Sequence, residues 1–255
     1  MGTLTIYWWP EGAASWASIP LPYATALDDA PYRTCSDSVG AVASRLDRGG
    51  GRMVRLTTTL NEAKHAETLR ELRGLVRYLQ AGGRLSLGYD DQMYLGAVAT
   101  PWVAGLGTVD TPGNVLTYGS PTHTSGDRWR AERLSPLLEE HLLLSSITTP
   151  GPFDRLIFST PPQQELAQGA LVRPWRCFPS LFLPESEARS TERILNDARN
   201  PGFTFDVDMT LQELPHELDA LVTTAGQMAG ANLTTDQGGK SLNDIVARHQ
   251  FTRVT

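Results

Sequence analysis

The sequence has 255 residues, a formal net charge of −6 and no run of Lys or Arg. This balance argues against a protein that binds nucleic acid along its surface, because such proteins usually carry a basic face. A hydrophobic fraction of 40% is too high for a disordered chain, and the length allows one large domain or two small ones. Abundant Gly, Pro, Thr and Ser favour a mainly β fold with many turns.

Targeting signals and metal-binding cysteine clusters are not visible in the sequence. There is no charged N-terminal segment followed by an apolar run, and no stretch of about 20 apolar residues. We therefore expect no signal peptide, no membrane insertion and a protein made in a cytoplasm. Cys35 and Cys177 lie outside any Cys/His cluster, so a zinc site is not expected. We expect two buried reduced thiols, and a disulfide between them stays open.

The N-terminal region is predicted to be extended. Residues 3–9 alternate and are rich in β-forming side chains, which indicates a strand. Prolines interrupt residues 10–40, where we expect an extended arm or irregular edge strands. Aromatic side chains in this region either cap the core or form a docking surface for a partner subunit. The candidate interface residues are Trp8, Trp9, Trp16 and Tyr23.

A strand, a helix and a second strand follow with almost no connecting loop. Residues 52–58 alternate as in a half-buried strand, and residues 84–88 alternate again. Between them we expect an amphipathic helix at about residues 60–81, ended by a Gly pair. Thr59 and Glu62 fit a capping box at its start, with Asn61 as a competing cap. The apolar stripe of this helix comprises Ala66, Leu69, Leu72, Val76 and Leu79.

Short β-like runs dominate the rest of the chain. Residues 89–128 are rich in Gly, Pro and Thr and are predicted to form hairpins and long loops. Residues 142–147 and 155–158 flank a Pro-Gly-Pro turn and predict a hairpin, and further strands are expected at 169–174 and 178–183. The clearest period-two pattern lies at residues 203–211, and an apolar-periodic stretch at 216–228 favours a helix.

No catalytic motif is complete in this sequence. His216 and Glu217 resemble the start of a zinc-protease helix motif, but Ala220 replaces the second His. Neither a nucleophile elbow nor a Gly-rich loop opening a helix occurs. Asp206 and Asp208 share one strand face, for which a solvated surface is favoured over a carboxylate or Ca²⁺ site. We expect no catalytic residue, no cofactor, no metal and no enzyme activity.

The order of these elements carries a resemblance. Residues 51–57, 63–79 and 83–88 resemble the core of the tail-tube-like β-sandwich domains of long-tailed phages. Residues 142–147 and 156–158, followed by Gly169-Ala170-Leu171-Val172-Arg173-Pro174 and Phe178-Pro179-Ser180-Leu181, are similar to the inserted β-module of minor tail proteins. Residues 203–211 then resemble the strand that returns to the first sandwich. The similarity covers roughly residues 50–90 and 140–212 and rests on order and pattern.

The resemblance implies a mainly β (α+β) fold, in which a tail-tube-like β-sandwich is flanked by one α-helix and carries an inserted small β-module. It implies a split sandwich of residues 1–90 plus 186–214 and an inserted module of residues 91–185. Residues 215–255 are then a C-terminal arm or partner-docking segment.

The implied function is structural. The protein resembles a distal tail protein or adjacent baseplate ring subunit, which links the tail tube to the tip hub at the virion tail tip. Its implied partners are the tail tube protein, the hub protein and further copies in a ring, commonly of six subunits. An acidic lumen would repel DNA, so the face carrying Asp206 and Asp208 is a candidate lumen surface. The alternative is a carbohydrate- or protein-binding β-sandwich module, with sugars stacking on the N-terminal aromatics, Trp102 or Trp129.

Overall fold

The computed structural model describes most of the chain between residues 2 and 213. The described residues are 2–8, 16–23, 25–38, 44–81, 83–116, 118, 121–134, 137–184, 193–196 and 203–213. Within them, the backbone alone is described at 32–38, 44–51, 62–63, 133–134, 137–138, 193–196 and 203. Trp9 and the predicted segment 215–255 lie outside the described residues.

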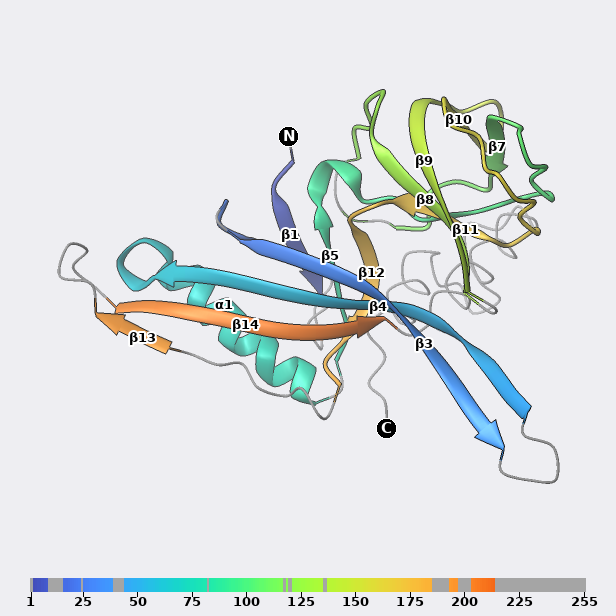
Figure 1. Cartoon of the computed structure of the whole chain (residues 1–255). Helices are drawn as coiled ribbons and strands as arrows, with labels where there is room; N and C mark the ends of the chain where they lie inside the picture. The colour runs from blue at the N-terminus through green and yellow to red at the C-terminus, as the bar shows by residue number, and fades with distance from the viewer. Residues whose placement is uncertain are drawn as a thin grey trace, which may run out of the picture.

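The larger of two sheets has eight strands, and every strand pair in it is antiparallel. The strand order is β2-β1-β5-β12-β14-β4-β3, and β13 also pairs with β14 (Figure 1). The bounds are β1 Leu4–Trp8, β2 Ala17–Pro20, β3 Ala26–Ser38, β4 Ser44–Asn61, β5 Leu85–Tyr89, β12 Cys177–Phe182, β13 Arg193–Asn196 and β14 Phe203–Glu213. The strands β2 and β3 lie at the two ends of this order, as expected for edge strands at residues 10–40.

The second sheet has six strands in the order β6-β11-β8-β9-β10-β7. Its bounds are β6 Gly96–Ala97, β7 Thr108–Thr111, β8 Arg128–Leu134, β9 Leu137–Thr148, β10 Asp154–Phe158 and β11 Leu171–Pro174. All six strands fall between β5 and β12 of the larger sheet, and a single 3₁₀ turn, η1 Asp90–Gln92, lies on the way in. The predicted hairpin of β9 and β10 is confirmed, and its turn includes Gly151 with φ of 71°.

Two antiparallel sheets and, within the described residues, one α-helix confirm the predicted mainly β class. The division into domains stays a prediction. One strand bears on its boundary, however, since β12 was expected in the module of residues 91–185. It pairs instead with β5 and β14 of the larger sheet, so the chain has returned to that sheet by Cys177.

The helix α1, Glu62–Gln80, packs on one face of the larger sheet and closes its hydrophobic core (Figure 1). The predicted alternation of β14 is confirmed, because every second residue of it is buried beneath this helix. The buried side chains are Leu69, Leu72, Leu75 and Leu79 from α1, Val54, Leu56 and Leu60 from β4, and Phe205, Val207, Met209 and Leu211 from β14.

The predicted capping box at Thr59 is wrong. The ladder between β4 and β14 continues to the pair Asn61 and Thr204, so the backbone at residue 59 is held in a strand. The Thr59 hydroxyl donates a hydrogen bond to Asp206 Oδ1 at 2.6 Å. The helix begins only at Glu62, which leaves Asn61 in the position before it.

The predicted apolar stripe of the helix is also displaced at its first turn. Ala66 is exposed, whereas Leu75, which was not assigned to the stripe, is fully buried. His65 has non-helical angles, φ −129° and ψ 29°, and its Nδ1 accepts a hydrogen bond from the Asn61 amide at 3.2 Å. This break interrupts the 3.6-residue period between the first turn and the remaining turns.

A two-stranded arm extends from the larger sheet. The register of β14 against β4 stops at Met53, whereas β3 and β4 continue to pair with each other as far as Ser38 and Ser44. Among the described strands, residues 32–38 and 44–51 therefore pair only with one another. Figure 1 shows this ribbon projecting well beyond the body of the molecule.

Substitution by Ala at two neighbouring positions of the helix should change the free energy of unfolding in opposite directions. Leu75→Ala is expected to lower the free energy of unfolding by about 2–5 kcal/mol, because it leaves a cavity between α1 and the sheet. Gly74→Ala adds a methyl group with no atom within 4 Å on an exposed part of the helix. It should raise that free energy by about 0.5–1 kcal/mol. Urea unfolding followed by circular dichroism measures both, and destabilisation by Gly74→Ala would contradict this placement of the helix.

Candidate functional site

The aromatic residues predicted as an interface lie in two kinds of environment. Trp8 contacts Tyr78 with ring centroids 5.3 Å apart, and Trp16 lies 4.2 Å from Tyr118, so both cover the core. Tyr23 is fully exposed. An interface role for these residues stays a prediction, and Trp9 lies outside the described residues.

Trp102 and Trp129 cannot serve as exposed stacking surfaces for sugars, as the alternative function required. Their side chains are 1% and 0% exposed and belong to the core of the six-stranded sheet. Cys177 is a buried free thiol, and burial raises its pKa to about 11. The side chain of Cys35 is outside the described residues.

Asp206 and Asp208 lie on the face of β14 that points away from the helix, as the alternation predicted. Asp208 accepts a hydrogen bond from Arg55 Nε at 3.0 Å, and this contact holds the pKa of the Asp208 carboxyl below its usual value. Asp206 is bound by the Thr59 hydroxyl. Because both carboxylates have protein partners, they do not converge on an open site. Whether this face lines a channel stays a prediction.

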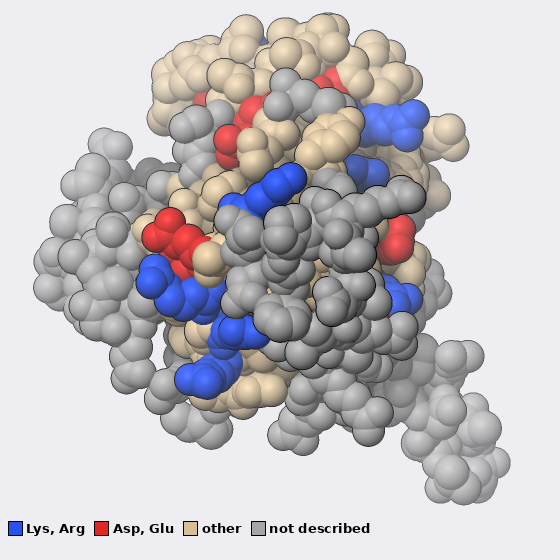
Figure 2. Space-filling model, turned by 90° about the vertical axis from the view of Figure 1, so that its left-hand side faces the viewer, with Lys and Arg blue, Asp and Glu red and all other residues tan. Residues whose placement is uncertain are grey.

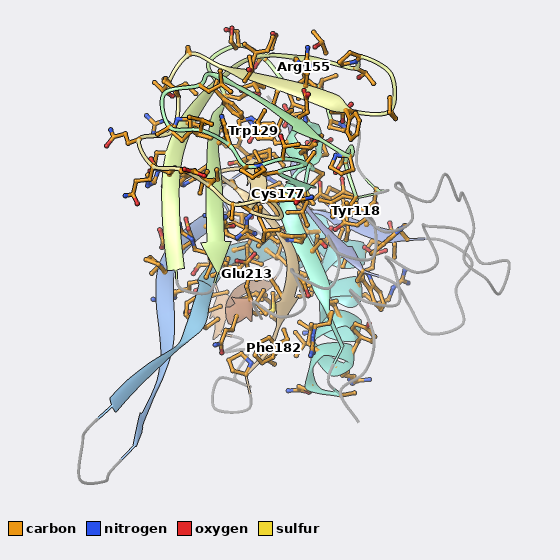
Figure 3. The ribbon with its side chains drawn as sticks, turned by 90° about the vertical axis from the view of Figure 1, so that its right-hand side faces the viewer. Tyr118, Trp129, Arg155, Cys177, Phe182 and Glu213 are labelled. Carbon is orange, nitrogen blue, oxygen red and sulfur yellow. The ribbon has the colours of Figure 1, made fainter. Side chains whose placement is uncertain are left out.

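A buried group of charges between the two sheets was not predicted. Arg173 of β11 is fully buried and donates hydrogen bonds to Glu132 of β8 and to Glu213 of β14, the latter from Nη2 at 2.8 Å. It also donates to the Cys177 carbonyl oxygen at 3.0 Å. One guanidinium thus joins the six-stranded sheet to the eight-stranded sheet. Figure 3 shows Glu213 and Cys177 between Trp129 on one side and Phe182 on the other.

Two further arginines extend this group, which we call the inter-sheet ion cluster. Arg52 donates to Asp29 at 2.9 Å and also to Glu139. Arg130 lies 3.6 Å from Asp29 and 3.8 Å from Glu132, and its guanidinium nitrogens have no hydrogen-bond partner in the described part of the chain. The cluster comprises Arg52, Arg130, Arg173, Asp29, Glu132, Glu139 and Glu213.

The electrostatics of the cluster indicate a structural role. Burial alone would raise the pKa of Glu132, but attraction by Arg173 and Arg130 outweighs it, so the pKa is lowered. Burial, and then repulsion from Arg173, lowers the pKa of Arg130. Acid–base catalysis needs a group that can exchange a proton with a substrate. Arg173, Glu132 and Glu213 are enclosed and paired, so this arrangement holds the sheets in register instead.

Only part of this cluster had a signal in the sequence. Arg130 and Glu132 stand two residues apart in β8, and the intervening Ala131 is buried as well. Charged residues at alternate positions of a strand would normally indicate a wet face. The partner carboxylate of Glu213 is 40 residues from Arg173 in sequence, and no local pattern reports such a pairing.

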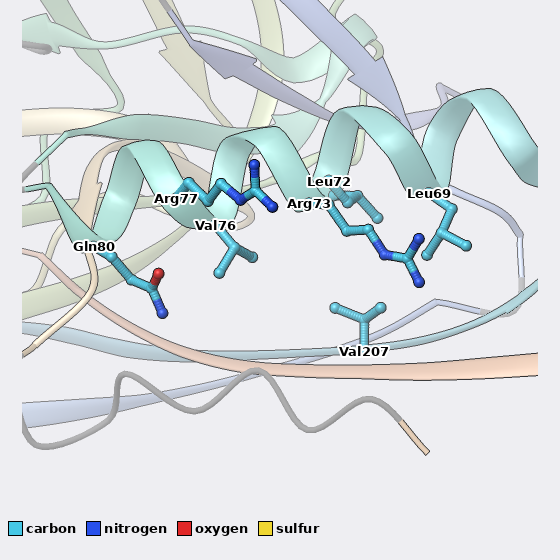
Figure 4. A pocket seen from close by; sticks show the side chains of 7 residues that line it. All are labelled: Leu69, Leu72, Arg73, Val76, Arg77, Gln80 and Val207. Carbon is cyan, nitrogen blue, oxygen red and sulfur yellow. The ribbon is translucent and has the colours of Figure 1, made fainter. Parts of the chain in front are cut away.

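A groove of about 290 Å³ lies between α1 and β14 (Figure 4). Its apolar surface comes from Leu69, Leu72, Val76 and Val207, and Arg73, Arg77 and Gln80 complete the lining. None of these side chains is a nucleophile or a carboxylate, so the groove offers a contact surface and no chemistry. Figure 2 shows basic and acidic side chains interspersed on one face of the molecule.

No protein-family model matches the sequence, and no curated protein matches it.

Within the described residues, no group of three or more His, Cys, Asp or Glu side chains is placed to hold a metal ion. In the same part of the chain, no helix is long and apolar enough to span a membrane.

Removal of the Arg173 guanidinium should weaken the connection between the two sheets. Arg173→Met removes the guanidinium that Glu132 and Glu213 share in a buried site, and we expect a loss of about 3–5 kcal/mol in the free energy of unfolding at neutral pH. Arg155→Met provides the control, since the side chains of Arg155 and its partner Asp110 are 47% and 35% exposed, whereas Arg173 is fully buried. Denaturant unfolding should show a much smaller change for this control.

The loss of unfolding free energy caused by Arg173→Met should also depend on pH. The folded-state pKa of Glu132 is below its unfolded value, so in the wild type its contribution is present above the unfolded pKa and is lost as the pH falls through the folded pKa. Without Arg173, burial raises this pKa, and protonation relieves the unpaired charge. The difference between wild type and Arg173→Met should therefore narrow as the pH falls toward about 4. A difference that is independent of pH would contradict the cluster.

Proposed function

We propose that this protein is a structural component of a phage tail tip, a distal tail or adjacent baseplate ring subunit that links the tail tube to the tip hub. The resemblance at residues 50–90 and 140–212 suggests this role, and the mainly β class with a single described α-helix is compatible with it. The observation that carries the proposal is the two-stranded arm of β3 and β4.

An arm of this kind is hard to explain in an isolated subunit. Residues 32–38 alone span about 23 Å at about 3.3 Å per residue. A two-stranded ribbon is marginally stable in water unless a third strand or another surface covers it. Among the described strands none pairs with its outer edges, although β8 and β9 contact β4 near Arg52. A neighbouring copy that packs against it would supply the missing contacts, and head-to-tail repetition of such a contact closes a ring.

The proposed partners follow from the position of a ring subunit between the tail tube and the tip hub. They are further copies in a ring, commonly of six subunits by the family resemblance, with the tail tube protein on one side and the hub protein on the other. The role requires no catalytic residue and no cofactor. The face with Asp206 and Asp208 remains the proposed lumen surface, although Arg55 neutralises part of its charge.

Shortening the arm tests this proposal. Tyr32 and Gly51 are opposite each other in the register, so residues 33–50 can be replaced by Asn-Gly, which closes a tight hairpin. The wild type is expected to form closed rings in negative-stain images and native mass spectra, and the shortened variant to remain a monomer. Unchanged circular dichroism would show that the sheet is retained, since β4 still pairs with β14 from Met53 onward.

A matched control is available at the far end of the molecule. Arg155→Gln changes an exposed charge in the six-stranded sheet and should leave the rings intact. Rings formed by the shortened variant would show that the arm is not the assembly contact. A wild-type protein that stays monomeric at every concentration would contradict the proposed function itself.

A further inference from the structure

A cleft of about 470 Å³ opens where the two sheets meet, and it shares no lining residue with the helix groove. Its walls come from four separate segments: Gly2 near the N-terminus, the end of β5 with η1, the loop that leads into β8 together with Arg128, and the turn between β11 and β12. Small-molecule sites commonly occupy such junctions, with volumes of about 300–1,000 Å³.

Two aromatic side chains, Trp175 and Tyr89, line this cleft and are partly exposed. The Trp175 amide donates to the Arg128 carbonyl oxygen at 2.9 Å, which fixes the turn against β8. The guanidinium groups of Arg52 and Arg130 lie 5.6 and 5.7 Å from the Trp175 ring centroid. The His141 ring lies closer still, with its centroid 4.5 Å from that of Trp175. The indole is therefore held rigidly by the inter-sheet ion cluster and His141, and only its remaining, partly exposed surface can act as a stacking platform.

The polar side chains of the cleft balance in charge. Asp91 and Asp127 face Arg128 and Arg176 across the same space. A cleft with no excess of either sign does not attract a polyanion or a polycation. It suits an uncharged ligand that can both donate and accept hydrogen bonds.

Two of these groups are ready to bind such a ligand. Asp91 Oδ1 is buried and has no hydrogen-bond partner in the described part of the chain, and a buried acceptor left in this state costs about 1–3 kcal/mol. Arg128 is exposed and makes no ion pair with any described residue. The other two are already engaged, since Asp127 binds Thr124 and Arg176 donates to the Tyr89 hydroxyl at 3.1 Å.

We propose that this inter-sheet cleft binds an uncharged saccharide. A sugar ring presents an apolar face to Trp175, and its hydroxyl groups donate to Asp91 and accept from Arg128. The inference rests on the fold and not on the proposed role in a tail tip. In such a tip, it would add a contact for a neutral surface glycan.

The test uses the full-length protein and a defined set of probes. Neutral oligosaccharides such as chitotriose, cellotriose and maltotriose are titrated at millimolar concentration, with intrinsic Trp fluorescence and saturation-transfer NMR as readouts. Sialylated and sulfated oligosaccharides serve as charged comparisons. Measurement on monomers separated by size exclusion makes the result independent of ring assembly, so failure here and failure of the tail-tip proposal are distinguishable.

Three variants locate the site. Asp91→Asn keeps the side-chain size and removes the negative charge, and Arg128→Gln removes the guanidinium. Each should weaken binding of the best neutral probe about tenfold. Phe153→Ala, at an exposed aromatic outside the cleft, should change nothing. Thermal melting confirms that each variant is folded. Absence of saturable binding to every neutral probe, stronger binding of the charged ones, or wild-type affinity of both the Asp91 and the Arg128 variant would each overturn the proposal.

Discussion

The buried contact between Arg173 and its two carboxylates is the interaction on which the arrangement of this molecule depends. Arg173 and Glu132 belong to the six-stranded sheet, and Glu213 belongs to the eight-stranded sheet. Removing these charges from water is costly unless all three are paired with good geometry. The guanidinium is satisfied on both sides in this arrangement, so the contact helps hold one sheet against the other.

The same contact connects the core to the surface. Arg130 and Arg52 extend it from Glu132 toward Asp29, and both lie against Trp175. The charge group that aligns the sheets therefore also supports the platform of the proposed saccharide cleft. A site built on rigid elements keeps its geometry better than one built on loops alone. A ring subunit has the same need, because an error in orientation would accumulate around the ring.

The larger sheet is covered unevenly, and this explains where partners are expected. The helix buries one face of β4 and β14, while on the opposite face Arg55 binds Asp208 and Thr59 binds Asp206. Beyond Met53 the two remaining strands continue without a described neighbour. The outer backbone edges of the arm thus have no pairing strand among the described residues.

The sequence by itself determined the mainly β class, the strand at 203–211, the helix and the β9–β10 hairpin, because their periodicity and turn residues are local properties of the chain. It could not place the first turn of the helix, since a ladder from β14 extends β4 past Thr59. Nor could it show that Arg173 forms an ion pair with Glu213, or that β12 belongs to the eight-stranded sheet. Only the tertiary structure decided these points, because burial makes a charge depend on a partner that lies far away in sequence.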